Sequence, residues 1–180
     1  MSLRYMIVGA LSVIAVSCTQ GKEAPTAAET HGHMGMSAAS GAAGMGSHVM
    51  VRPDDIKWMD GPPSLPKGAK FAVIEGDPAK EGFFVMRAVL PANYRIPPHW
   101  HPAVERVTVL SGTMYLGMGE RFDESAGQAL PAGTYAAMPA GMRHFAYTRG
   151  ETTIQIGTNG PWGITYLNPA DDPRQQQKKQ

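Results

Sequence analysis

Two histidines and a glutamate stand close together in the segment His99-Trp100-His101-Pro102-Ala103-Val104-Glu105. In an extended strand, side chains two residues apart point to the same face, so His99 and His101 lie together and Glu105 keeps their parity. A third histidine, His144, follows a Pro- and Gly-containing turn before another predicted strand. Three neutral imidazoles and one carboxylate suit Fe, Mn, Ni, Cu or Zn and leave coordination positions for water or substrate. We therefore predict one mononuclear divalent transition-metal site with the ligands His99, His101, Glu105 and His144.

The spacing of these residues resembles the two motifs of the cupin superfamily, G-x5-H-x-H-x3-4-E-x6-G and G-x5-P-x-G-x2-H-x3-N. The first motif is matched by His99, His101, Glu105 and Gly112, and the second by Gly133, Pro139, Gly141 and His144. Asn93 and Thr148 stand where the family has its first glycine and its last asparagine. The resemblance implies that the four ligands hold one metal inside a small barrel. By strand parity with His144, Thr148 is expected to face inward and add a hydroxyl to the lining.

Short apolar runs separated by Gly and Pro turns dominate the chain from Val49 onward. These runs are rich in aromatic and branched residues, which favours strands; they lie at residues 56–59, 70–74, 83–90, 106–110, 113–118, 134–138, 145–148, 152–158 and 163–167. No stretch of helix length shows a 3.6-residue apolar period. Residues 119–128 are predicted to form an extended loop, with a helical turn at 123–125. The fold class is therefore all-β, and the two motifs make it the cupin double-stranded β-helix, a jelly-roll barrel.

Composition divides the 180 residues into four parts. We predict a signal peptide at 1–17, a low-complexity, disordered tether at 18–48, a cupin domain at 49–173 and a polar tail at 174–180. The net charge is +1, and removal of residues 1–17 takes away only Arg4, which leaves 15 basic and 15 acidic residues. A neutral chain without a basic cluster in its body argues against nucleic acid as a partner.

The first residues have the anatomy of an export signal, with Arg4, an apolar run at 6–16 and the small residue Ser17. The run is too short for a stable membrane span. The only cysteine, Cys18, follows at once, and Ala15-Val16-Ser17-Cys18 resembles the lipobox of bacterial lipoproteins, which implies lipidation of Cys18. Ala15 replaces the usual leucine, so ordinary cleavage stays an alternative. Thr19 in place of aspartate implies, by resemblance to Gram-negative sorting, a periplasmic protein anchored to the outer membrane through this lipid alone.

The tether contains a second group of metal-binding side chains, His31, His33, Met34 and Met36. Imidazole and thioether groups this close could chelate copper and deliver it to the barrel. Drift in a low-complexity linker is the alternative interpretation.

The residues near the predicted metal also suggest what surrounds it. Strand parity places Val107, Val109 and Ala146 inward, which predicts an apolar face. Arg143, beside His144, could meet an anionic substrate, but an outward position in solvent is the favoured expectation. The candidates for the mouth of the barrel, or simply for its core, are Met86, Met114 or Met118, and Tyr115.

Two classes of function fit these features. The first is an exported metalloenzyme of the dioxygenase, decarboxylase or isomerase type, acting on a small-molecule substrate at open metal positions. Its acid–base chemistry would rest on a metal-bound water, on Glu105 as the candidate catalytic residue, or on a lid residue such as Glu120 or Asp123. The second class is a non-catalytic metal- or ligand-binding sensor lipoprotein of the cell envelope. By resemblance to small cupins, a homodimer is the default expectation.

Overall fold

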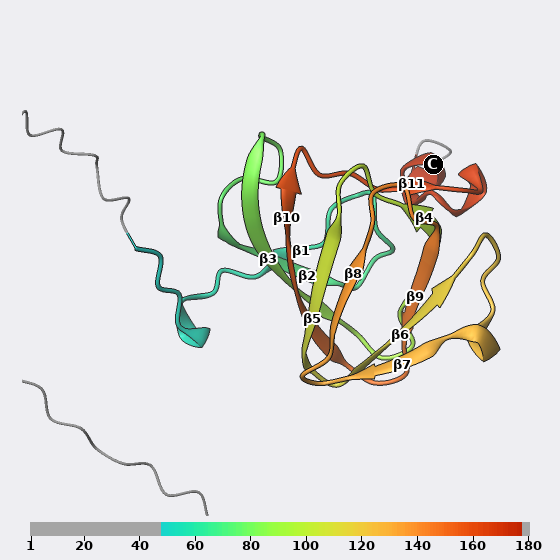
Figure 1. Cartoon of the computed structure of the whole chain (residues 1–180), viewed down its shortest axis with the longest axis horizontal. Coiled ribbons are helices and arrows are strands. Elements are labelled where there is room, and N and C mark those ends of the chain that lie inside the picture. Colours follow the sequence, from blue (N-terminus) through green and yellow to red (C-terminus); the bar gives the residue numbers. More distant parts are fainter. Residues whose placement is uncertain (1–47, 178–180) are drawn as a thin grey trace, which may run out of the picture. The chain divides into compact units, whose positions relative to one another are not determined.

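Residues 48–177 are described by a computed structural model, and they form two antiparallel β-sheets around one core (Figure 1). The larger sheet has the strand order β1 (Met59–Asp60), β2 (Lys70–Glu75), β3 (Gly82–Leu90), β10 (Thr152–Gly160), β5 (Glu105–Ser111) and β8 (Tyr135–Met138). The smaller sheet has the order β11 (Thr165–Tyr166), β4 (Arg95–Trp100), β9 (His144–Thr148), β6 (Thr113–Met118) and β7 (Gln128–Pro131). The predicted all-β class is confirmed.

The core lies between the sheets because alternate residues of the central strands point inward. Along β3, the side chains of Phe84, Met86, Ala88 and Leu90 are buried, whereas the three residues that alternate with them are partly exposed. Strand β10 pairs with β3 over its whole length and has the same alternation. The inward positions predicted around the metal are correct, since Val107, Val109 and Ala146 are all buried in this core.

Several predicted boundaries differ from the observed ones at the edges of the sheets. The strand predicted at 56–59 is wrong except at Met59, because the 3-10 helix η1 (Pro53–Asp55) and an irregular segment lead directly into the two-residue β1. Similarly, β11 keeps only two of the residues predicted at 163–167. Strand β7 was not predicted at all, and it pairs with β6 through Met114↔Leu130 and Tyr115↔Ala129.

Short helices lie in the loop before β7 and at the C-terminal end. The helical turn predicted at 123–125 is observed as η2 (Glu124–Ala126), with the Asp123 side chain accepting a hydrogen bond from the Ser125 backbone N–H. After β11 come η3 (Pro169–Asp171) and the helix α1 (Pro173–Gln177), which includes the start of the predicted polar tail. None of the helices within residues 48–177 has the length and apolar character needed to span a membrane.

The two positions that depart from the motifs act together in the turn between β3 and β4. Asn93 has a φ of 58°, a left-handed conformation that asparagine tolerates better than most residues other than glycine. The Thr148 hydroxyl donates to the Pro91 carbonyl at 2.6 Å and accepts from the Tyr94 backbone N–H at 3.1 Å. The prediction that Thr148 adds a hydroxyl to the lining of the site is therefore wrong, because this hydroxyl fastens the turn.

Aromatic rings of β6, β9 and the segment between β6 and β7 form a layer on the outer face of the smaller sheet. Tyr115 stacks on Tyr147 with ring centroids 4.7 Å apart, and Phe122 lies 4.9 Å from Phe145. The Arg95 guanidinium lies over the Phe122 ring and pairs with Glu124 at 2.5 Å. Tyr115 is thus part of an outer aromatic layer.

Candidate metal centre

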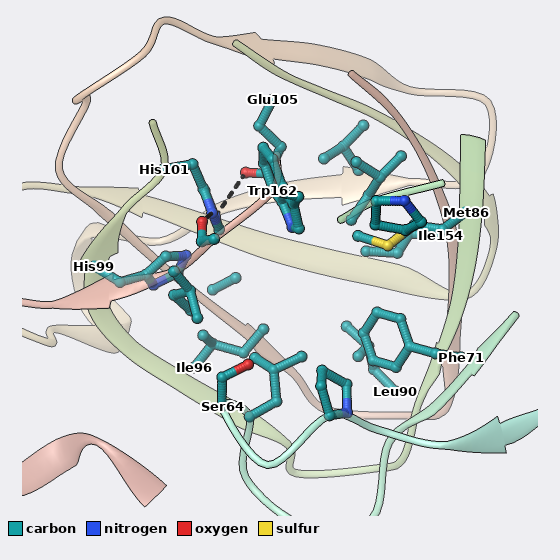
Figure 2. Close-up of a pocket in the computed structure, with 18 of the residues that line it drawn as sticks. Ser64, Phe71, Met86, Leu90, Ile96, His99, His101, Glu105, Ile154 and Trp162 are labelled. Carbon is teal, nitrogen blue, oxygen red and sulfur yellow. Dashed lines mark hydrogen bonds and ion pairs between the residues drawn. The ribbon is translucent and has the colours of Figure 1, made fainter. Parts of the chain in front are cut away.

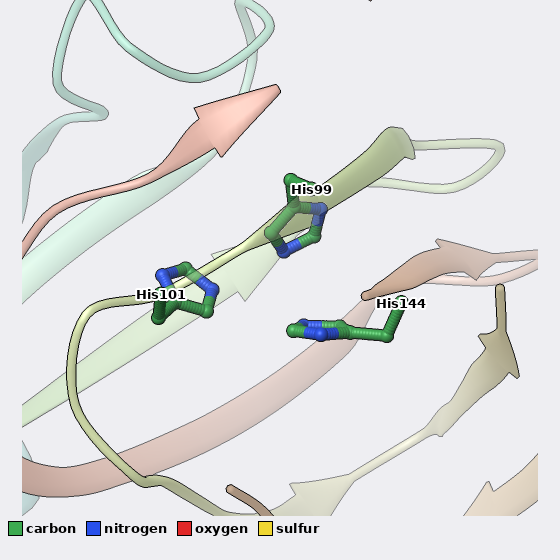
Figure 3. A group of neighbouring side chains, drawn as sticks. All are labelled: His99, His101 and His144. Atoms are coloured by element: carbon green, nitrogen blue, oxygen red, sulfur yellow. The ribbon is translucent and has the colours of Figure 1, made fainter. Parts of the chain in front are cut away.

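Neighbouring strands of the smaller sheet bring the predicted ligands together. His99 on β4 and His144 on β9 are direct partners in the antiparallel register. His101 lies just beyond the end of β4, and Glu105 is the first residue of β5 in the opposite sheet. The three imidazole rings point toward one another (Figure 3), and one ring nitrogen from each lies within 4.8 Å of the others. All four residues are buried.

Each histidine also uses its second ring nitrogen in a bond to the backbone. The Nδ1 atoms of His99, His101 and His144 lie 2.7, 2.7 and 2.9 Å from the carbonyl oxygens of Pro97, Gly163 and Met142, in that order. A carbonyl oxygen can only accept a hydrogen bond, so the proton must be on Nδ1. In the neutral rings the Nε2 atoms then carry lone pairs. Such backbone acceptors fix the tautomer and orientation of metal-binding histidines.

Glu105 completes the group on the Nε2 side of the rings. Its Oε2 atom is 3.2 Å from His144 Nε2 and 3.6 Å from His101 Nε2. Two ligands that each lie about 2.1 Å from one tetrahedral or octahedral ion are about 3.0 to 3.4 Å apart, which is close to these separations. The buried histidines together with Glu105 could therefore hold a metal ion.

The electrostatics of the site favour a cation beside Glu105. Burial lowers the pKa of His99 to about 3, with help from the neighbouring His144 and His101, and burial likewise lowers the pKa of His101. Burial alone would raise the pKa of Glu105. The His144 ring, which donates to the carboxylate when its Nε2 is also protonated, and the other imidazoles outweigh burial, so the pKa of Glu105 is lowered. For His144, the Glu105 carboxylate outweighs burial and raises the pKa. Glu105 therefore attracts positive charge to the point where the Nε2 atoms meet.

Trp162 is a residue of the site that the sequence analysis missed. Its ring stacks on His101 with centroids 4.1 Å apart and an interplanar angle of 13°. Its backbone N–H donates to the Pro78 carbonyl at 2.8 Å, and the next residue, Gly163, supplies the acceptor for His101 Nδ1. A lone tryptophan after a Gly-Pro pair matches neither motif, and the predicted strand at 163–167 was the only signal near it.

A cavity of about 400 Å³ opens beside the four residues (Figure 2). His99, His101 and Glu105 lie at one end of it, and Phe71, Leu90 and other apolar side chains lie across from them. Of the candidates for its mouth, Met86 and Met114 do line the cavity. Met118 is 48% exposed at the end of β6 and does not line it. Tyr115 does not line it either, because its ring faces the outer aromatic layer.

The proposed lid residues lie away from the cavity. Glu120 forms an ion pair with Arg143 in which both side chains are more than half exposed, and Asp123 caps η2. Neither acidic residue lines the cavity, so the idea that one of them acts as an acid–base lid is wrong in this conformation. Arg143 points to solvent, as predicted. Two predictions fall outside the described residues: a second metal-binding group at His31, His33, Met34 and Met36, and lipidation of Cys18.

Comparison with solved structures supports the fold. The polyketide cyclase RemF from Streptomyces resistomycificus is 18% identical, with a TM-score of 0.60 over 73% of this chain and 94% of that chain. The DMSP lyase DddQ from Ruegeria pomeroyi DSS-3 is 18% identical, with a TM-score of 0.51 over 64% of this chain and 63% of the other. An RmlC-like cupin from Shewanella frigidimarina is 12% identical, with a TM-score of 0.50 over 63% and 91% of the two chains. At these identities the likeness establishes the cupin fold alone.

Comparison of the sequence with protein families gives a more specific result. No curated protein sequence matches the chain. A family model described as the ChrR Cupin-like domain matches residues 46–161, which include both motifs and all four predicted ligands. Together with the two-sheet fold and the buried group of three histidines and a glutamate, this match shows that the chain belongs to the ChrR cupin-like domain family of the cupin superfamily.

Proposed function

We propose that this protein is a metal-dependent enzyme that acts on a small molecule, with one transition metal held by His99, His101, Glu105 and His144. The reaction would be of the dioxygenase, decarboxylase or isomerase type. The observation that carries the proposal is that all three Nδ1 atoms bond to backbone carbonyls, which leaves the Nε2 atoms facing Glu105 at the wall of a cavity. A site that only stabilised the fold would not need a cavity of about 400 Å³ beside it.

The chemistry of the site follows from its ligands and its walls. A bound transition metal would supply Lewis-acid or redox activation of a substrate oxygen. The lowered pKa of Glu105 keeps its carboxylate ionised at neutral pH. Oε2 would hold the metal, and the other carboxylate oxygen could accept a proton from a substrate held in the cavity. Trp162 and the apolar wall exclude water, and the low local dielectric strengthens the interaction between charges there.

A non-catalytic role in sensing or ligand binding is the second candidate, and one observation favours it. Among the residues that line the cavity, the only carboxylates are Glu105 and Asp60. Asp60 is exposed and bonded to Lys70, so it is not placed for proton transfer at the metal end. Within the described residues, the site thus offers a single buried carboxylate in addition to the three histidines, which also suits a protein that binds its ligand without converting it.

Metal analysis of the mature protein separates these functions. We expect one equivalent of Fe, Mn, Ni, Cu or Zn with exchangeable water, and loss of both metal and turnover in His101→Ala. The matched control is His48→Ala, because His48 is exposed and outside the cluster. Turnover that persists without metal would contradict the proposal of a metal-dependent enzyme. One equivalent of metal with no exchangeable water and no turnover would favour the binding protein.

A further inference from the structure

The cavity has a polar end and an apolar remainder. The three histidines and Glu105 form the polar end, and the opposite wall consists of side chains such as Phe71, Leu90 and Ile154 (Figure 2). No lysine or arginine is among the residues that line this cavity in the described part of the chain. Away from the histidines, the polar side chains that line it are Ser64, which offers a single hydroxyl, and Asp60, which is exposed and paired with Lys70.

This distribution restricts which ligands can enter. A charged group placed against the apolar wall would lose its hydration without gaining an ionic partner, which is strongly unfavourable. A molecule with many hydroxyls would leave most of them without hydrogen-bond partners, which weakens its binding. An apolar body would instead gain from leaving water. Only a group that reaches the histidine end can be polar or charged.

We propose that the ligand of this site is a small molecule with one oxygen-chelating group and an otherwise uncharged, apolar body. This inference rests on the proposed function, because the chelating group is assigned to the bound metal. The cavity of about 400 Å³ is near the small end of ligand pockets, so the body is of single-ring size. Dicarboxylates and sugars are excluded as ligands by the same argument.

Three hydroxamates with the same chelating group test the proposal on the metal-loaded full chain. They are acetohydroxamate, with almost no body, benzohydroxamate, with an apolar ring, and 4-carboxybenzohydroxamate, with a charged ring. We expect benzohydroxamate to bind about tenfold or more tightly than either of the others, measured by calorimetry and by the spectrum of the metal. Equal affinities for benzohydroxamate and its 4-carboxy derivative would overturn the inference.

Two substitutions in the cavity wall test where the ring of the probe binds. Phe71→Ala removes a ring across from the histidines and should weaken benzohydroxamate about tenfold while leaving acetohydroxamate unchanged. Val73 lines the cavity but is 45% exposed, so Val73→Lys is compatible with folding and introduces a cation. Compared with Val73→Gln, it should raise the affinity for the 4-carboxy derivative about tenfold. A charged probe that gains nothing from this lysine would count against the proposed orientation of the ligand.

The three probes also separate this inference from the proposed function. If acetohydroxamate binds the metal and benzohydroxamate binds no better, an accessible metal site is supported and the apolar ligand class is wrong. If none of the three binds to a protein that contains metal, the open metal position is wrong, and the ligand class is overturned with it.

Discussion

Trp162 and the three backbone carbonyls decide how the histidines are held, although none of them would contact the metal. The stacked indole limits rotation of the His101 ring, and the Gly163 carbonyl fixes its tautomer. His99 and His144 have carbonyl partners but no indole above them. His101, which lies beyond the end of β4, therefore depends more on its neighbours than the two strand histidines do.

Replacement of Trp162 tests this dependence. We expect Trp162→Ala to weaken metal binding about tenfold or more, as changes next to metal ligands commonly do, and Trp162→Phe to restore part of the affinity because a ring is kept. Competition with a chromophoric chelator gives the affinities. Trp58→Ala is the matched control, since Trp58 is 39% exposed and does not line the cavity. Equal affinities for Trp162→Ala and Trp58→Ala would contradict the positioning role.

At the scale of elements, β9 links the metal centre to the outer aromatic layer. His144 and Ala146 face the cavity, whereas Phe145 and Tyr147 face the segment between β6 and β7. Gly117 on β6 makes room for the Phe145 ring, because a Cβ there would lie 2.0 Å from Phe145 Cζ. The position of His144 thus depends on packing on both faces of the smaller sheet.

Gly117→Ala should therefore destabilise the fold. An added methyl group must displace the Phe145 ring or move β6, and overpacking of this kind costs about 1 to 3 kcal/mol. Urea unfolding of the metal-free protein measures the change. Gly157→Ala on β10 is the control, because its Cβ would make only an ordinary contact of 3.4 Å with Phe83. If both variants unfold at the same urea concentration, the packing argument fails.

The sequence was sufficient to predict the strands and shared side-chain faces that depend on the local spacing of residues. The apolar run at 83–90 predicts a strand, and the His-x-His pair and its distance to Glu105 predict which side chains share a face. The pairing of His99 with His144 comes from the cupin motif, since no local period specifies which strands become neighbours. Strand β7 was missed because residues 128–131 are few, and two of them are a glutamine and a proline.

The contacts that could not be predicted join residues far apart in the chain. Trp162 meets His101, and the apolar wall of the cavity combines residues of β2, β3 and β10. Thr148 was assigned to the lining by parity, but parity gives a face of the sheet and says nothing of which part of that face borders the cavity. No sequence pattern positions the loop that contains Glu120 and Asp123, so the sequence could not predict that both lie away from the cavity.

At the scale of the whole molecule, the metal would join two separate segments of the chain and both sheets. His99, His101 and Glu105 are close in sequence, whereas His144 belongs to a later segment. Metal that binds only the folded state adds about 2.7 kcal/mol of stability when its free concentration is 100 times the dissociation constant. We expect EDTA to lower the Tm of the unmodified protein, as measured by calorimetry, and to leave the Tm of His101→Ala unchanged. An unchanged Tm in both would contradict tight binding at this site.

The proposed envelope location concerns the whole molecule as well and rests on the sequence alone. If Cys18 carries a lipid, Cys18→Ser should move the protein from the membrane fraction to the soluble periplasmic fraction, which fractionation and immunoblotting would show. Ala24→Ser, at a position beyond the lipobox, is a control that should leave the protein in the membrane fraction. If the protein with its native Cys18 is recovered in the soluble fraction, ordinary signal cleavage without lipidation is favoured instead. The expected homodimer likewise stays a prediction.

The hydrogen bond from His101 to Gly163 shows that the structural unit around the candidate metal site ends later in the chain than the family match does. The family match stops at Pro161, so a fragment trimmed to it would keep all four ligands but lose both the indole and the carbonyl that hold His101. The next two residues, Trp162 and Gly163, hold the His101 ring by stacking and by a hydrogen bond. A version of this domain that is moved into another chain must therefore include Trp162 and Gly163, because the residues that position the candidate metal site extend past the recognisable motifs.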